Sequence, residues 1–158
     1  SPSRGLGDVY KRQGVNRVPY RVYGDPEIYK AEQQAIFRGD IWHFAVTDWE
    51  IPEPGDYRTI DIGETPIIVL RDQKGAINAM VNRCAHRGSA VVRKLRGNAM
   101  DHTCIYHHWC YDTKGDLIGV PLMRGIRGMG GYPKEFRKDD HGLVKLRGSE
   151  FSGVVFGT

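Results

Sequence analysis

Residues 84–88 read CAHRG, and residues 104–121 read CIYHHWCYDTKGDLIGVP. They place a Cys-x-His pair and a Cys-x-x-His pair on two short segments, and each pair can be supplied by one tight loop. Strands between the loops can hold the pairs face to face. Thiolate and imidazole together suit zinc or an iron–sulfur cluster. The candidate metal ligands are therefore Cys84, His86, Cys104 and His107.

The spacing of the two pairs is unlikely to arise by chance. With three cysteines and six histidines in 158 residues, both pairs together form a coincidence of roughly one in a hundred. The chance of a coincidence falls further when the flanking residues are counted. Arg87-Gly88 follows the first pair, and aromatic residues surround the second pair. A zinc ion bound by the same four side chains is the simpler alternative to an iron–sulfur cluster. The Cys-x-His pair with its Arg-Gly and the β-rich surroundings favour a cluster over zinc.

The two segments resemble the Rieske motif in the large (α) subunits of aromatic-ring-hydroxylating oxygenases. A Rieske centre is a [2Fe–2S] cluster with two Cys on one iron and two His on the other. The resemblance implies that Cys84 and Cys104 bind one iron, and that His86 and His107 bind the second. It extends from about Asp25 to the end of the chain. Residues 106–125, YHHWCYDTKGDLIGVPLMRG, are most similar to the salicylate, anthranilate and terephthalate group.

Two departures from related patterns bear on the cluster. The family usually has Gly after the second ligand histidine, and here His108 stands there, which we interpret as a neighbour of the site rather than a ligand. Respiratory Rieske proteins carry extra cysteines and place a hydroxyl residue where Trp109 stands. Fewer hydrogen bonds to cluster sulfur lower the reduction potential. We therefore expect a potential near the low end of the Rieske range, about −150 mV.

The resemblance implies an electron-transfer function. A reductase or ferredoxin, with NAD(P)H as the ultimate donor, would deliver electrons to the [2Fe–2S] cluster. The cluster would pass them to a mononuclear Fe(II) that activates O2 in a catalytic domain, often that of a neighbouring subunit in a trimer. His107 would contact a carboxylate that bridges to that iron. We expect this chain to be an N-terminal fragment without the catalytic domain and its catalytic residues, because only His141 lies beyond Pro121.

Two other functions fit the same ligands. A standalone Rieske ferredoxin would carry electrons without belonging to an oxygenase subunit, but such ferredoxins are shorter and lack the helix expected over residues 26–38. A zinc-stabilised interaction module is the third possibility. Analysis of iron and acid-labile sulfide would separate the zinc module from both cluster proteins.

Periodicity predicts the local structure. Asp25 as N-cap and Pro26 in the first turn indicate a helix over residues 26–38. Alternating apolar residues predict short strands at 41–46, 57–62, 66–71 and 76–82, and a closing hairpin of 143–146 and 151–156 that turns around Gly148-Ser149. Together with the resemblance, this predicts a mainly β fold: a Rieske-type antiparallel β-sandwich with cluster-binding loops and a short N-terminal helix.

Composition limits the remaining possibilities. Residues 1–20 lack apolar periodicity and are interpreted as a disordered or non-native tail, which leaves 21–158 as one domain. The net charge of +4 is too modest to indicate a nucleic-acid partner, and no apolar run approaches the length of a membrane span. Three cysteines are too few for a disulfide scaffold and favour a reducing cytoplasm. Cys110 is expected to be a small buried or half-buried thiol. His43, His102 and His141 are expected to be satisfied core or surface histidines rather than ligands.

Overall fold

The computed structural model describes residues 18–158, so residues 1–17 of the expected tail lie outside the described part. The chain divides into two compact units, one ending at Ile41 and the other comprising Trp42–Thr158, and each is described by itself. A 3-10 helix, Tyr20–Tyr23, opens the first unit. None of the helices in residues 18–158 is both long enough and apolar enough to cross a membrane.

The predicted helix lies in the first unit. α1 spans Pro26–Glu32, and a π-helical turn, Gln33–Phe37, continues it to the expected end near residue 38. The Asp25 carboxylate accepts a hydrogen bond of 3.0 Å from the backbone N–H of Glu27, as expected of an N-cap. The same bond holds the pKa of Asp25 below its ordinary value. The last turn differs from the prediction only in its hydrogen-bonding pattern.

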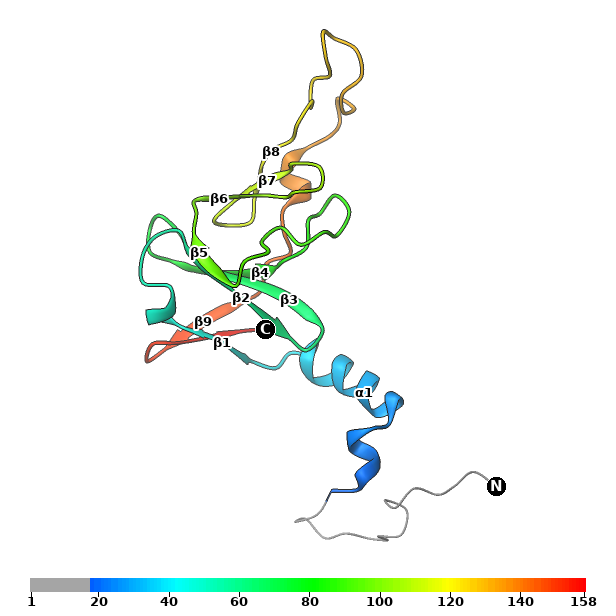
Figure 1. Cartoon of the computed structure of the whole chain (residues 1–158), viewed down its shortest axis with the longest axis vertical. Coiled ribbons are helices and arrows are strands. Elements are labelled where there is room, and N and C mark those ends of the chain that lie inside the picture. Colours follow the sequence, from blue (N-terminus) through cyan, green and yellow to red (C-terminus); the bar gives the residue numbers. More distant parts are fainter. Residues whose placement is uncertain (1–17) are drawn as a thin grey trace, which may run out of the picture. The chain divides into compact units, whose positions relative to one another are not determined.

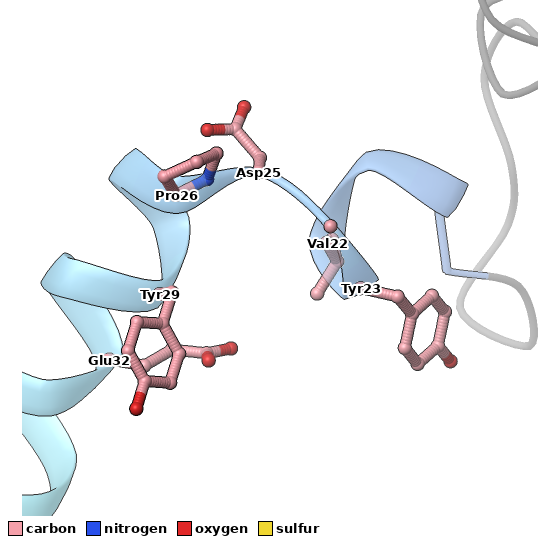
Figure 2. A pocket seen from close by; sticks show the side chains of 7 residues that line it. Val22, Tyr23, Asp25, Pro26, Tyr29 and Glu32 are labelled. Carbon is pink, nitrogen blue, oxygen red and sulfur yellow. The ribbon is translucent and has the colours of Figure 1, made fainter. Parts of the chain in front are cut away.

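An open pocket of about 570 Å³ lies where the 3-10 helix leads into α1 (Figure 2). Its lining includes the side chains of Tyr23, Tyr29 and Glu32 around the Asp25-Pro26 turn. All of its lining residues belong to the first unit, and none of them is a predicted ligand.

Within residues 42–158 the strands form three antiparallel sheets (Figure 1). The largest has the order β4-β3-β2-β5, made of Ile77–Val81, Thr65–Arg71, Asp56–Ile62 and Arg96–Asn98. The second has the order β1-β10-β9, made of His43–Thr47, Val154–Gly157 and Gly148–Phe151. The third has the order β6-β7-β8, made of Asp101–Thr103, Cys110–Asp112 and Leu117–Gly119. The 3-10 helices of this unit are Asp48–Glu50 and Lys138–His141. The predicted mainly β, antiparallel fold is confirmed.

The predicted closing hairpin is wrong in its turn. β9 already begins at Gly148, and the chain reverses at Ser152-Gly153, where φ is +50° and +78°. Two consecutive residues with positive φ suit the right-handed twist of a two-residue hairpin, and Ser-Gly can adopt that conformation. The expected strand 143–146 makes a single bridge instead, from Lys145 to Met80 of β4.

The core of the second unit positions the candidate site. One cluster of buried side chains joins the largest sheet, through Leu70 and Met80, to the third sheet, through Tyr111. Cys84 and Cys104 belong to the same cluster, with 4% and 1% of their surface exposed. The two thiols are therefore fixed by the packing of two sheets rather than by their loops alone.

Candidate metal centre

The first predicted pair lies on a tight loop, residues 84–89, called the first loop below. The backbone N–H of Cys84 donates to the carbonyl of Ser89 at 2.8 Å, and the N–H of Gly88 donates back to the carbonyl of Cys84 at 2.8 Å. These two bonds close the loop on itself. His86 lies at the tip and is partly exposed.

The second pair lies on a loop of the same construction, residues 104–109, called the second loop. The N–H of Cys104 donates to the carbonyl of Trp109 at 2.8 Å, and the N–H of His108 donates to the carbonyl of Cys104 at 2.9 Å. His107 lies at the tip of this loop, as His86 does in the first. Two loops with one hydrogen-bonding pattern therefore each present a buried thiol and a partly exposed imidazole.

The repeated pattern explains the unusual His108. Gly88 closes the first loop with a φ of +70°, and His108 closes the second with a φ of +57°. Both positions need the left-handed conformation, which glycine adopts without strain and other residues adopt at a cost. A side chain at position 88 would meet no atom within 4 Å, and the His108 side chain is exposed. The loop geometry therefore tolerates a side chain at this position.

Replacing His108 by glycine is expected to stabilise the protein by a few tenths to about 1 kcal/mol, because relief of left-handed strain exceeds the entropy that glycine loses on folding. The matched change Gly88→Ala is expected to destabilise it by about 1 kcal/mol. Denaturant unfolding of both variants measures these values. A His108→Gly variant that is clearly less stable than the parent would show that the imidazole makes a contact that outweighs the strain.

The structure brings the predicted ligands together as two pairs, one of imidazoles and one of thiols. The His86 and His107 rings lie 4.5 Å apart between centroids, at an interplanar angle of 72°. Cys84 and Cys104 both lie close enough to the Tyr111 hydroxyl to raise its pKa by their charge, although burial is the larger cause. Two thiols thus lie inside, and two imidazoles lie at the surface end of the same site.

One buried ring nitrogen at the site lacks a hydrogen-bond partner in the described structure, and a bound metal cluster could satisfy it. Nδ1 of His86 is buried and has no hydrogen-bond partner among the residues that the structure describes. A buried imidazole nitrogen without a partner costs free energy unless a ligand satisfies it. In residues 18–158 no group of three or more His, Cys, Asp or Glu side chains could hold a single metal ion. A Rieske cluster asks for only two protein ligands on each iron.

Tyr111 of β7 is a site residue that the sequence prediction missed. Its hydroxyl accepts a hydrogen bond from the backbone N–H of Ala85 at 3.1 Å and lies 3.2 Å from Sγ of Cys84. With the Ala85 bond in place, the hydroxyl proton is free to point at the sulfur. Burial, followed by the hydrogen bond to Cys84, raises the pKa of Tyr111 well above its ordinary value, so the hydroxyl stays protonated. The signal available in the sequence was strand alternation, which turns Tyr111 inward between Cys110 and Asp112.

The change Tyr111→Phe is expected to lower the reduction potential of a bound cluster by about 30–60 mV. A hydrogen bond to sulfur stabilises the reduced, more negative state, and about 1 kcal/mol of differential stabilisation corresponds to about 40 mV for one electron. Potentiometric titration followed by visible absorption measures the shift. An unchanged potential would show that the hydroxyl proton does not reach the sulfur.

Trp109 closes the site from the protein side. Its indole stacks on the His86 imidazole, with centroids 4.8 Å apart and an interplanar angle of 12°. Its Nε1–H donates to the hydroxyl of Tyr132 at 3.3 Å, and the Phe136 and His141 rings lie 5.8 and 5.6 Å away. Only 2% of Trp109 is exposed. The indole therefore fixes the plane of one imidazole and keeps water from one side of the site.

The Asn82 side chain stabilises the first loop through hydrogen bonds to the backbone that follows the loop. Its Oδ1 accepts from the backbone N–H groups of Val91 and Val92 at 3.0 and 2.9 Å, and its Nδ2 donates to the Val92 carbonyl at 2.7 Å. The side chain is buried, so these bonds are shielded from water. They tie the chain before Cys84 to the chain after the loop.

The other candidate residues lie outside this group of four. Cys110 is half-buried, as predicted: its Sγ lies 3.6 Å from Oδ1 of Asp101, and burial raises its pKa. His141 is satisfied, as predicted, because its Nδ1 lies 2.8 Å from the Arg137 carbonyl. His102 is buried, but its Nε2 has no partner in the described part of the chain, and burial lowers its pKa. It is therefore not the fully satisfied histidine that the sequence suggested.

Comparison with known proteins identifies similar domains. The sequence profile of the Rieske [2Fe-2S] domain matches residues 41–133. The chain is 50% identical over 143 residues to the anthranilate 1,2-dioxygenase large subunit of Burkholderia cepacia, covering 90% of the chain and 34% of that protein. It is 45% identical to the alpha 2 subunit of the terminal oxygenase component of terephthalate 1,2-dioxygenase from Comamonas sp, with the same coverage.

A solved structure supports the same likeness. Naphthalene 1,2-dioxygenase from Rhodococcus sp., bound to indole, superposes with a TM-score of 0.79 at 37% identity, covering 89% of this chain and 31% of that one. The chain therefore spans about a third of the length of the relatives that it matches.

Proposed function

Because this chain belongs to the Rieske [2Fe–2S] domain family, we propose that it is the electron-transfer part of an aromatic-ring-hydroxylating oxygenase large subunit. The observation that carries this proposal is the 50% identity to a dioxygenase large subunit over 90% of the chain. Because the relatives are about three times longer, the mononuclear Fe(II), the substrate pocket and the catalytic residues would belong to the rest of such a protein. A standalone ferredoxin is less favoured, since these relatives are oxygenase subunits.

In this proposal Cys84 and Cys104 bind one iron of the cluster, and His86 and His107 bind the other. The buried thiols, the neighbouring imidazoles and the unpartnered Nδ1 of His86 support this assignment. These 158 residues hold three cysteines, so they cannot supply four thiolate ligands. When bound, such a cluster accepts and releases one electron at a time.

The surrounding residues would set the reduction potential of the cluster and its exposure to water. The Tyr111 hydroxyl lies 3.2 Å from the Cys84 sulfur and would donate a hydrogen bond to it when a cluster is bound, and Trp109 orients His86 and excludes water from its face. Both imidazoles lie at the partly exposed end of the site, where a partner could approach them. We propose that His107 makes the contact, in the longer protein, to the carboxylate that bridges to the catalytic iron. Its position at the tip of the second loop supports this role.

The proposed partners follow from the same family. The relatives are named as subunits or components, so other subunits belong to their complexes. We propose a reductase or ferredoxin supplied by NAD(P)H as the donor, and a trimer-based assembly in which the acceptor iron belongs to the same or a neighbouring subunit. A reducing cytoplasm is part of this proposal, and the three cysteines, all free thiols, are compatible with it.

A redox titration of the iron-loaded chain tests the proposal. We expect a midpoint near the low end of the Rieske range, about −150 mV, because Trp109 replaces a hydroxyl donor near the cluster. Visible absorption recorded against applied potential measures it. A clearly positive midpoint would contradict an oxygenase-type domain.

A further inference from the structure

The sequence around the first loop is strongly basic. Between Asp72 and Asp101 there are six cationic side chains and no carboxylate. Five of them are exposed and lie in or next to the first loop and the segment that follows it; we call them the basic band: Arg83, Arg87, Arg93, Lys94 and Arg96. Without these five, acidic residues would outnumber basic ones in the whole chain. The modest net charge therefore conceals a local concentration of positive charge.

Hydrogen bonds between side chains and the backbone hold the segments of the band together. Asn82 ties the chain before Arg83 to the chain before Arg93 through its bonds to Val91 and Val92. The next residues run along β2, where the Lys94 carbonyl accepts from the Thr59 hydroxyl at 3.2 Å. The band thus extends from the loop that carries His86 to the edge strand β5.

The fold does not use these charges. No ion pair in the described residues includes a member of the band, although Arg58, opposite Arg96 across β2 and β5, pairs with Glu50 at 3.4 Å. Like charges opposite each other in a sheet destabilise the pairing. A set of exposed, unpaired cations beside an electron-transfer site is therefore better explained by a partner than by stability.

An apolar side chain lies within the band. Leu95 is 72% exposed and is flanked by Lys94 and Arg96. Protein interfaces commonly combine an apolar contact with surrounding charges that guide the encounter. A duplex nucleic acid would contact the cations through its phosphates, and it would place apolar surface against Leu95 only if its bases unstacked, so the composition favours a protein partner.

We propose that the basic band is the docking surface for an acidic face of the electron-donor protein. This inference rests on the proposed function. Docking at Arg87, directly after His86, would bring the donor to the imidazole end of the site. One electron would leave the donor, which is oxidised, and would reduce one ferric ion of the cluster to ferrous; no covalent bond forms or breaks.

The test uses the iron-loaded chain and a defined probe, an acidic plant-type [2Fe–2S] ferredoxin whose potential lies below the Rieske range. Arg93→Glu and Lys94→Glu are introduced together, since both side chains are exposed and unpaired. Lys74→Glu is the control, because the turn that carries it lies at the opposite end of β4 from Arg83. Stopped-flow mixing with reduced ferredoxin gives the rate of electron transfer, and calorimetry with oxidised ferredoxin gives the Kd.

The double reversal is expected to lower the second-order rate constant at least tenfold at low ionic strength and to weaken binding in parallel. Both differences should shrink as salt screens the charges, while Lys74→Glu stays within about twofold of the parent. Equal effects of the control, or none from the double variant, would overturn the docking surface. So would tighter binding of duplex DNA than of ferredoxin, lost in the double variant. Cluster content and potential, measured on the same samples, report separately on the proposed function.

The change Leu95→Asn tests the apolar contact separately from the electrostatic attraction that speeds association. It leaves the charges of the band intact, so the salt dependence of the association rate should stay unchanged while the complex dissociates several-fold faster. A variant that binds the ferredoxin as tightly as the parent would leave charge alone as the basis of docking and would contradict the apolar contact assigned to Leu95.

Discussion

Replacement of Cys104 by serine is expected to abolish cluster binding. The thiol is 1% exposed and belongs to the core that joins two sheets, so its position is fixed by packing. A serine hydroxyl is not deprotonated at neutral pH and is a harder, weaker ligand for this iron. Iron and acid-labile sulfide, two of each per cluster in the parent, should fall below about a tenth of that level, with loss of visible absorption.

The third cysteine supplies a matched control. Cys110 lies six residues further along the same chain and is half-buried, but its sulfur contacts Asp101 rather than the site. The change Cys110→Ser should therefore leave iron, sulfide and potential unchanged. If Cys110→Ser lost the cluster while Cys104→Ser kept it, the assignment of the ligands would be wrong. Far-UV circular dichroism of both variants separates loss of ligand from loss of fold.

Replacement of Trp109 by alanine is expected to have the largest effect on stability. Removing a buried indole costs about 3–5 kcal/mol, since both transfer free energy and a cavity contribute. The change also frees the His86 ring from its stacking partner and opens the site to water. Denaturant unfolding of the iron-free chain measures the first effect, and a shifted reduction potential of the loaded chain reports the second.

Two further variants locate the origin of that effect. Trp109→Phe keeps an aromatic face toward His86 and should retain most of the stability. Tyr132→Phe removes only the hydroxyl that accepts from the indole, at 3.3 Å, and should cost about 1 kcal/mol. An alanine variant as stable as the Tyr132→Phe variant would show that Trp109 does not support the core.

The four proposed ligands were visible in the sequence because each pair is local. Cys84 with His86, and Cys104 with His107, lie on single loops that close through their own backbone bonds. Tyr111 was missed because its contact with Cys84 spans 27 residues and depends on how two sheets pack. The spacing of a motif carries no information about such a contact.

The same distinction holds for the fold. The helix beginning at Pro26 was predicted because its cap and first turn are local signals, and its Asp25 cap is present. The hairpin turn was misplaced because Gly148-Ser149 and Ser152-Gly153 are both plausible turns, and only pairing with β1 selects the second. The strands β5 to β8, three residues each, are too short to show alternation. The net charge of +4 did not reveal the basic band, because carboxylates elsewhere in the chain offset its positive charge.

Pulsed electron–nuclear double resonance on the reduced, iron-loaded chain, with 15N-labelled histidine in an otherwise unlabelled protein, shows directly whether two histidines bind the cluster. We expect two strongly coupled histidine nitrogens, one of which disappears in a His107→Cys variant that retains its iron. Iron and sulfide should be present in equal amounts before the measurement. A reduced cluster without strongly coupled histidine nitrogen, or a protein that binds zinc and no labile sulfide, would contradict the proposed set of two cysteine and two histidine ligands.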